Sequence, residues 1–335
     1  MMIPDSCYLC ADKIHKIMKN TLFAAIFLCL FLVNSCSRND NPSSDKPQAI
    51  VSFVKNVEGD YWKQIKMAID AECAAGNCQS IVRDAKDDAD IDGQLNDVST
   101  FAELRKTYDI KGVNFAPIYT AEDHRPEQKL AELIGNEIPV IIIDSPVDES
   151  SNPLKNVIKA YVGTDNYEAG RLLAEAVNAD ASTVFAARIK NSIPSSARYD
   201  GFCKGIGSKV PIWETLNDLE TPENFAEQLA GHPGAKNLVF FNGHLCSSVL
   251  EACDGRNVYS FDAYKPFLEN IMNDTGSVRG IVAQNTFEMG RLAVKAIADP
   301  NMKGDVFVPV IYISSKTIAS KEARPFLDYF GIEIQ

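Results

Sequence analysis

Short apolar segments alternate with amphipathic ones along most of this 335-residue chain, and this alternation limits the possible folds more than any other feature. The apolar positions of the longer segments, such as 61–73, recur at helical spacing. Two series of strand candidates follow one another, 49–54, 79–85, 111–117 and 138–144, then 157–163, 182–187, 211–216, 237–242, 257–262 and 278–284. Near-continuous apolar strands that alternate with helices are typical of parallel sheets covered on both faces. We therefore predict an α/β protein with two doubly wound parallel-sheet lobes.

The N-terminal segment has the pattern of a secretory signal. A basic start at Lys19 is followed by an apolar run, 21–33, too short to span a bilayer comfortably, and by small and polar residues up to Cys36. We predict a signal peptide over 1–35, with an uncleaved membrane anchor as the alternative. Met18 would begin a signal of ordinary length, so we interpret residues 1–17 as a mis-assigned start or an unusual extension.

The end of this segment resembles bacterial lipoprotein signals. The resemblance implies that Cys36 becomes the lipidated first residue of the mature chain, and the polar, proline-containing stretch 36–47 then serves as a flexible linker. We expect the folded part to lie in the periplasm or cell envelope, held to a membrane by this anchor.

Charge and cysteine spacing exclude several classes of partner and cofactor. The formal net charge is −12 and the chain has no run of Lys or Arg, so neither nucleic acid nor an anionic membrane surface is an expected partner. Cys73 and Cys78 flank a short turn and could pair in an oxidising compartment, which the sequence leaves open. Neither this pair nor Cys246 and Cys253 has the spacing of a zinc site, so we expect no metal and no cofactor.

Polar side chains follow several of the expected strands. In open α/β sheets, ligands bind beyond the carboxyl ends of the strands. The residues at these ends are Lys55, Glu58, Asp144, Asn242, Asp262 and Gln284. Each alone is more often a turn residue or a helix cap, but their joint occurrence predicts a binding site.

From about residue 48 to 317, the chain resembles the ribose-binding protein family of periplasmic sugar-binding proteins. Their ligand module is shared by the effector domains of lactose-repressor-type regulators. The resemblance rests on the aromatic pair Tyr61 and Trp62, IPVIIID (138–144), VGTDNYEAGRLLAE (162–175), SSARYDGF (195–202), VFFN (239–242), VYSFDAYKP (258–266) and IVAQNTFEMGRLAVKAI (281–297). These motifs occur in the family's order.

The resemblance implies a type I periplasmic binding protein fold with a three-segment hinge. One lobe would comprise 48–162 and 285–312, the other 163–284 and 313–335. A sugar would bind in the cleft between them, with Tyr61 and Trp62 against its apolar faces. Arg198, Asp144 and Asp262 would hold its hydroxyls, and Asn242 and Gln284 would add amide contacts.

Some positions depart from the family pattern. Ser145 stands where many members have an arginine, and Gly59 and Asp60 replace an asparagine and a proline. Lys55 stands where the family often has a small polar residue. Lys55 with Arg198 leads to the hypothesis of a different hydroxyl pattern, or of a sugar with a negative group.

Other polar or aromatic residues have structural explanations. Asp165 and Asn166 begin a predicted helix and are interpreted as N-caps, Trp213 as a core residue, and His244 as a helix-start residue near the cleft.

The function we predict is that of a monomeric binding lipoprotein that presents a small sugar or sugar derivative to a membrane permease of the ABC type. The alternative is a ligand-sensing subunit for a membrane receptor or histidine kinase. A transcription regulator is excluded because residues 1–47 contain no helix-turn-helix pattern. Asp144 and Asp262 superficially resemble the paired carboxylates of a glycosidase, but no catalytic motif accompanies them, so we do not expect an enzyme.

Overall fold

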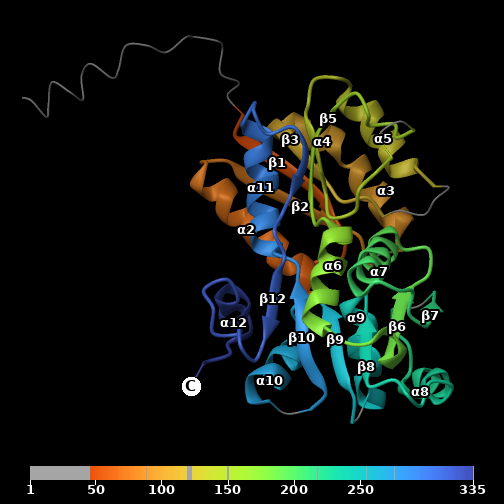
Figure 1. Ribbon diagram of the computed structural model, residues 1–335. Helices are drawn as coiled ribbons and strands as arrows, with labels where there is room; N and C mark the ends of the chain where they lie inside the picture. The colour runs from red at the N-terminus through yellow and green to blue at the C-terminus, as the bar shows by residue number, and fades with distance from the viewer. Residues whose placement is uncertain are drawn as a thin grey trace, which may run out of the picture. The chain divides into compact units, whose positions relative to one another are not determined.

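The computed structural model describes residues 46–87, 89–118, 123–148, 151–216, 218–253, 255–274 and 276–334 (Figure 1). The expected signal peptide, Cys36 and the linker up to residue 45 lie outside these residues. Among the helices that are described, none combines the length and the apolar character needed to cross a membrane.

The first sheet contains six strands in the order β11-β5-β4-β3-β1-β2, and all of its neighbours pair in parallel. The strands are β1 (Gln48–Val54), β2 (Gln79–Asp84), β3 (Asp109–Phe115), β4 (Val140–Ile143), β5 (Ile158–Gly163) and β11 (Gly304–Phe307). The interior strand β1 is buried from Ala49 to Val54, as expected for a strand covered on both faces.

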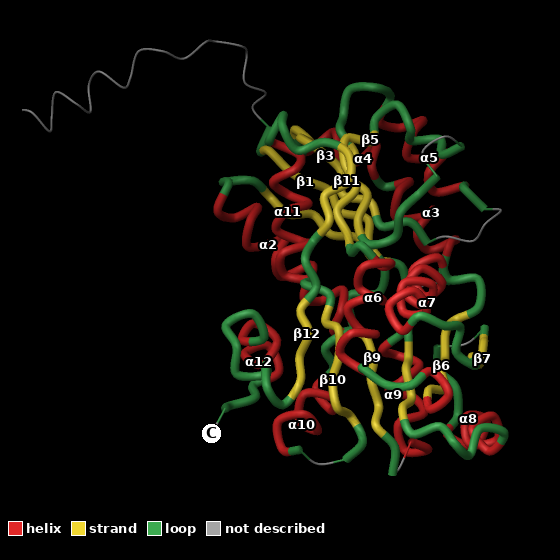
Figure 2. The backbone as a smooth tube through the Cα atoms, in the orientation of Figure 1, coloured by secondary structure: helices red, strands yellow, loops and turns green. Residues whose placement is uncertain are grey.

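Helices cover both faces of this sheet (Figure 2). They are α2 (Asp60–Ala75), α3 (Ile91–Ser99), α4 (Phe101–Thr107), α5 (Arg125–Ile134) and α11 (Thr286–Ala298). Ile50 and Val54 of β1 pack with residues of α2 and α11, whereas Val51 and Phe53 pack with α3, α4 and α5. Because side chains alternate between the two faces along the strand, β1 contributes residues to two separate apolar clusters, one on each face of the sheet. We call this sheet and its helices the first lobe.

The second sheet has the order β12-β10-β9-β8-β6-β7. Its strands are β6 (Val184–Ile189), β7 (Ile212–Thr215), β8 (Asn237–Phe240), β9 (Asn257–Phe261), β10 (Val278–Ala283) and β12 (Ile311–Ser314). β12 runs antiparallel to β10, and the other pairs are parallel.

In the part of the chain that the structure describes, six helices cover the second sheet. They are α6 (Asn166–Val177), α7 (Ile193–Ile206), α8 (Pro222–Ala230), α9 (Gly243–Val249), α10 (Lys265–Asn273) and α12 (Arg324–Phe330). α6 and α7 pack on one face, while α8, α9, α10 and α12 pack on the other. Short 3-10 turns at Ala181–Thr183 and Leu250–Cys253 complete this second lobe.

The chain passes between the two sheets after β5, after β10 and between β11 and β12. The predicted architecture of two doubly wound lobes is confirmed. The sequence pattern groups segment 157–163 with the second series of strands. That grouping is wrong, because this segment forms β5, which pairs with β4 in the first sheet. The pattern misses β11 and β12, each four residues long; β11 is mostly exposed and β12 mostly half-exposed. The expected lobe boundary at 312 lies inside β12.

The C-terminal stretch, to which the sequence assigns no role, belongs to the second lobe and reaches the first. Phe326 and Leu327 of α12 are buried in the apolar cluster beneath the second sheet. The hydroxyl of Tyr329 donates a hydrogen bond to Asp60 Oδ1, 3.0 Å away, at the start of α2.

Two glycines allow α6 and α7 to approach closely. A Cβ added at Gly170 would lie 1.9 Å from the Arg198 carbonyl oxygen, and one added at Gly201 would lie 1.9 Å from the Tyr167 carbonyl oxygen. Backbone contact at this crossing therefore fixes α7 against α6, and with it the position of Arg198.

We expect Gly201→Ala to lower the free energy of unfolding by about 1–3 kcal/mol, because overpacking of the crossing outweighs the better helix propensity of alanine. Gly234→Ala is the control, since a Cβ there meets nothing within 4 Å. Urea denaturation of both variants measures the difference. Equal stability of the two would show that α6 and α7 can separate without cost.

Candidate functional site

Asp144 and Asp262 occupy matching positions in the two lobes. Asp144 follows β4 and Asp262 follows β9, and each of these strands is third in the order of its sheet. Their backbone N–H groups donate to Val162 and Val282 of the neighbouring strands, at 3.1 and 3.0 Å. Both have left-handed backbones, with φ of 67° and 66°. Aspartate tolerates this conformation better than most residues, and its occurrence at the same strand-end position in both lobes marks the candidate site.

The Asp144 carboxylate is almost enclosed by hydrogen-bond donors. Oδ1 accepts from the Tyr61 hydroxyl at 2.7 Å, and Oδ2 accepts from the Ser145 hydroxyl at 2.9 Å. The Lys55 ammonium forms an ion pair with Oδ2 at 3.3 Å, and the two side chains are 11% and 15% exposed. This pair lies at the border of the first lobe, largely withdrawn from water.

These contacts fix the protonation states of two groups. Burial raises the pKa of Asp144, but the Lys55 charge and the hydrogen bonds from Tyr61 and Ser145 outweigh it, so the pKa lies below its ordinary value. Burial, together with the Asp144 charge, raises the pKa of Tyr61 well above its ordinary value. Near neutral pH, Asp144 is therefore an anionic acceptor and Tyr61 a neutral hydroxyl.

Gln284 connects the two lobes. Its Nε2 donates to Asp262 Oδ1 at 2.8 Å, and its Oε1 accepts from the Thr164 hydroxyl at 2.8 Å. The same Oε1 lies 3.3 Å from the Tyr61 hydroxyl oxygen, whose proton is directed mainly at the nearer Asp144. Thr164 and Gln284 each follow a strand after which the chain passes to the other sheet. A continuous series of polar contacts thus runs from Asp144 through Tyr61 and Gln284 to Asp262, at the hinge.

Arg198 supplies a second cation from the second lobe. It is 4% exposed; Nε donates to Asn166 Oδ1 at 2.7 Å, and Nη1 donates to the Phe241 carbonyl at 3.1 Å. Its guanidinium carbon lies 4.3 Å from the ring centroid of Phe261, the residue before Asp262. Packing and hydrogen bonds therefore hold this side chain in one orientation.

Three of the predicted site residues have other surroundings. Trp62 is 5% exposed and packs in the apolar cluster beneath the first sheet, edge-to-face with Tyr61. Asn242 Oδ1 accepts from the Leu245 N–H at 2.8 Å and so caps α9. Glu58 is exposed before α2, while Lys55, Tyr61, Asp144, Asp262, Gln284 and Arg198 line the border between the lobes.

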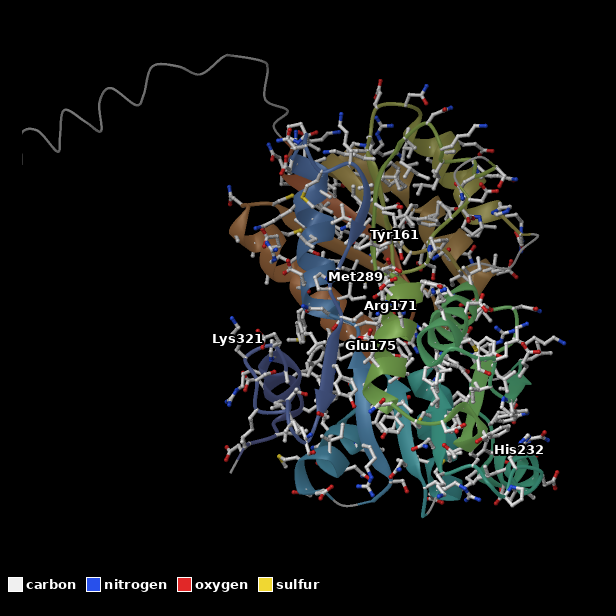
Figure 3. All side chains as sticks on the ribbon, viewed as in Figure 1. Tyr161, Arg171, Glu175, His232, Met289 and Lys321 are labelled. Carbon is white, nitrogen blue, oxygen red and sulfur yellow. The ribbon has the colours of Figure 1, made fainter. Side chains whose placement is uncertain are left out.

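Several members of this region are not predicted from the sequence. Asn166, expected to be a cap, has the side-chain acceptor that orients Arg198; Asp165 alone caps α6, through the Glu168 N–H. Thr164, 3% exposed, is missed because a single threonine before a helix has no distinctive signal. Tyr161 donates to the Asp144 carbonyl at 2.8 Å, and Met289 Sδ lies 3.8 Å from the Tyr61 hydroxyl; Figure 3 labels both.

Two side chains near the second lobe's strand ends have local partners. His244 Nδ1 lies 3.1 Å from Asp218 Oδ2 on an exposed surface. Trp213, expected in the core, is only partly buried and packs on Phe225 with 5.5 Å between ring centroids, because β7 is an edge strand. Within the described residues, no group of three or more His, Cys, Asp or Glu side chains could hold a metal ion.

The arrangement places fixed donors and acceptors on both sides of the border between lobes. Lys55, Tyr61 and Arg198 donate, whereas Asp144, Asp262 and the Gln284 carbonyl accept. Such a set suits a small ligand with several hydroxyl groups, because each hydroxyl both donates and accepts.

Several solved structures have the same fold at low sequence identity. A glucose-galactose binding protein from Geobacillus stearothermophilus has a TM-score of 0.65 and 19% identity, with 82% of this chain and 99% of that chain covered. A carbohydrate transporter solute-binding protein from Agrobacterium radiobacter, in complex with D-arabinose, has a TM-score of 0.68 and 18% identity, covering 84% and 99%. A periplasmic ribose ABC transporter protein from Conexibacter woesei has a TM-score of 0.67 and 17% identity, covering 85% and 96%.

A comparison with curated protein sequences finds no match. The family model described as "Periplasmic binding protein domain" matches residues 50–300, which include strands of both sheets, though not β11 and β12, and every residue of the network described above. The two-lobed fold, the three passages of the chain between the sheets and this match together show that the chain belongs to the periplasmic binding protein family, with the type I fold.

Proposed function

We propose that this protein is an extracytoplasmic solute-binding protein that binds a small, uncharged sugar between its lobes and presents it to a membrane permease. The observation that carries the proposal is the polar series Asp144–Tyr61–Gln284–Asp262, which joins the lobes at the hinge. Each contact in this series is one that a sugar hydroxyl can replace with equivalent geometry.

The position of the series couples binding to lobe closure. Tyr61 and Asp144 belong to the first lobe and Asp262 to the second, so a ligand that contacts all three favours the state in which the lobes are together. A ligand shifts such an equilibrium only by its differential affinity for the two states. Contacts on both sides of the border supply that difference.

Lys55 and Arg198, taken alone, indicate an anionic sugar. The balance of charged side chains in the region supports an uncharged ligand instead. The Lys55 charge is already paired with Asp144, and Arg198 donates to two neutral acceptors. Together with Asp262, the region contains two cations and two carboxylates. An added anion would compete with Asp144 for Lys55, whereas hydroxyl groups need no further countercharge.

The aromatic pair has divided roles in this proposal. Tyr61 lies beside both aspartates, so a sugar that binds between the lobes would meet its ring and hydroxyl. Trp62 packs behind it with 5.4 Å between ring centroids, and the Lys55 ammonium lies 5.6 Å from the Trp62 ring centroid. We assign direct ligand contact to Tyr61 and support of Tyr61 and Lys55 to Trp62.

The anchor and the partner follow from the sequence and from the relatives' names. Lipidation at Cys36 would hold a monomer at the membrane that contains its permease. Several similar structures are named as sugar-binding, solute-binding or substrate-binding proteins of ABC transporters, which supports import and argues against a glycan-acting enzyme. We place the protein in the periplasm or cell envelope on the same grounds.

A thermal-unfolding screen tests the binding proposal. The chain from Ser37 onward is heated with neutral monosaccharides, polyols, sugar acids and short oligosaccharides. A ligand at about 100 times its Kd stabilises the fold by about 2.7 kcal/mol and should raise Tm by roughly 5 to 10 °C. We expect the shift from neutral monosaccharides. A shift from sugar acids alone would contradict the charge argument, and no shift from any sugar would contradict the proposal.

Tyr61→Phe should weaken sugar binding about tenfold or more, because it removes a hydroxyl between a carboxylate and Gln284. Tyr167→Phe removes the same group from a side chain that is 41% exposed on α6 and should leave Kd unchanged. Isothermal titration calorimetry measures both. Equal Kd values for the two variants would remove Tyr61 from the site.

Lys55→Met should also weaken neutral-sugar binding about tenfold or more, because it leaves the Asp144 carboxylate with reduced compensation for its burial. Lys63→Met, on the exposed side of α2, is the matched control. An affinity that stays within twofold of the unmodified chain would exclude Lys55 from the site. The melting temperature without sugar, recorded for each variant, separates lost binding from lost folding.

A further inference from the structure

Helix α2, which carries Tyr61 at its start, ends in a hydrogen-bonded cap. The helix stops at Ala75, Gly76 follows, and Asn77 adopts a left-handed backbone with φ of 53°. The Asn77 N–H donates to the Ala74 carbonyl at 3.2 Å, and the Cys78 N–H donates to the Cys73 carbonyl at 2.9 Å. This pair of bonds defines a Schellman motif.

The motif places two thiols in the positions whose side chains meet. In a Schellman motif, the residue two positions beyond the cap commonly contacts the third-last helical residue. Here these residues are Cys78 and Cys73, and both pack in the apolar cluster beneath the first sheet. The hydrogen bond between them also keeps their Cα atoms within about 7 Å, the range that a disulfide spans.

We propose that Cys73 and Cys78 form an intramolecular disulfide that closes the C-terminal cap of α2. The proposal rests on the extracytoplasmic location proposed above, because disulfides persist in oxidising compartments. The disulfide would be a covalent modification of α2, the helix that positions Tyr61. Its formation would not depend on which sugar binds.

The reaction requires a disulfide oxidant, such as an oxidised thiol-disulfide exchange protein. The half-exposed Cys78 loses its proton and attacks one sulfur of the oxidant, which expels a thiolate and leaves a mixed disulfide. Cys73 then loses its proton and attacks Cys78 Sγ, which releases the second thiolate. Two electrons pass to the oxidant, and two protons leave the cysteines.

The surroundings of the thiols make an assisted reaction necessary. Burial, followed by the neighbouring Cys78, raises the pKa of Cys73 to about 12, and burial also raises the pKa of Cys78. Little thiolate is therefore present near neutral pH, and uncatalysed oxidation is slow. Once formed, the bond is largely covered, since Cys73 is 1% exposed.

Peptide mapping tests the proposal on the full chain, isolated from the cell envelope in the presence of an alkylating reagent. Trypsin cleaves after Lys66 and Arg83, so one peptide, 67–83, holds both cysteines. We expect this peptide unalkylated and about 2 Da lighter than the dithiol form, because two hydrogens are lost. Peptide 199–204, which contains the partly buried Cys203, shows that the reagent reacted.

A doubly alkylated 67–83 peptide would overturn the proposal. A parallel sample, isolated without the alkylating reagent and incubated with glutathione disulfide and a thiol-disulfide exchange protein, then distinguishes the cause: oxidation would place the fault in the assumed compartment, and no oxidation would place it in the geometry. Sugar binding, measured on the same sample, reports separately on the proposed function.

Thermal unfolding gives a second readout. A reductant should lower Tm of the isolated protein by about 5 °C, because opening the cross-link restores chain entropy to the unfolded state. Cys78→Ala keeps the apolar contact of the cap and should abolish this response, while Cys203→Ala should retain it. A reductant response that persists in Cys78→Ala would contradict the assignment.

Discussion

The buried ion pair between Lys55 and Asp144 is the interaction on which the site depends. Its side chains are nearly enclosed, so each charge needs its partner and further hydrogen bonds to offset the loss of water. Tyr61 and Ser145 supply them, and Tyr61 extends the contacts to Gln284 and Asp262. The hydrogen bonds that compensate the burial of the Asp144 carboxylate therefore also connect the two lobes.

The backbone around this network is specialised to hold it. Asp144 and Asp262 adopt left-handed conformations at equivalent strand ends, and the close crossing of α6 and α7 at Gly170 and Gly201 sets the position of Arg198. On the other side of the hinge, Tyr329 of the C-terminal helix contacts Asp60 at the start of α2. Both ends of α2 thus have specific restraints, the Tyr329 contact at its start and the Schellman cap at its end.

Much of the fold can be predicted from the sequence because its signals are local. Buried strands such as 49–54 and 138–144 are almost entirely apolar, and the helices between them have apolar positions at regular spacing. The short strands β11 and β12 escape detection because four-residue edge strands that are exposed or half-exposed have no strong apolar pattern. The assignment of β5 to the first sheet depends on its pairing with β4, which is a long-range contact.

Residue type and spacing along the chain are enough to predict the alternation of strands and helices, the two lobes and the strand-end positions of Asp144, Asp262 and Gln284. Tertiary structure decided what each polar group does: Asn166 orients Arg198, Asn242 caps α9, and Trp62 packs behind Tyr61. A polar residue at a strand end can cap a helix, stabilise a turn or bind a ligand, and the local sequence looks the same in each case. Which of these roles a residue takes depends on the donors and acceptors that the rest of the fold brings within about 3 Å of it. It also depends on burial, because a buried polar group without a partner costs free energy.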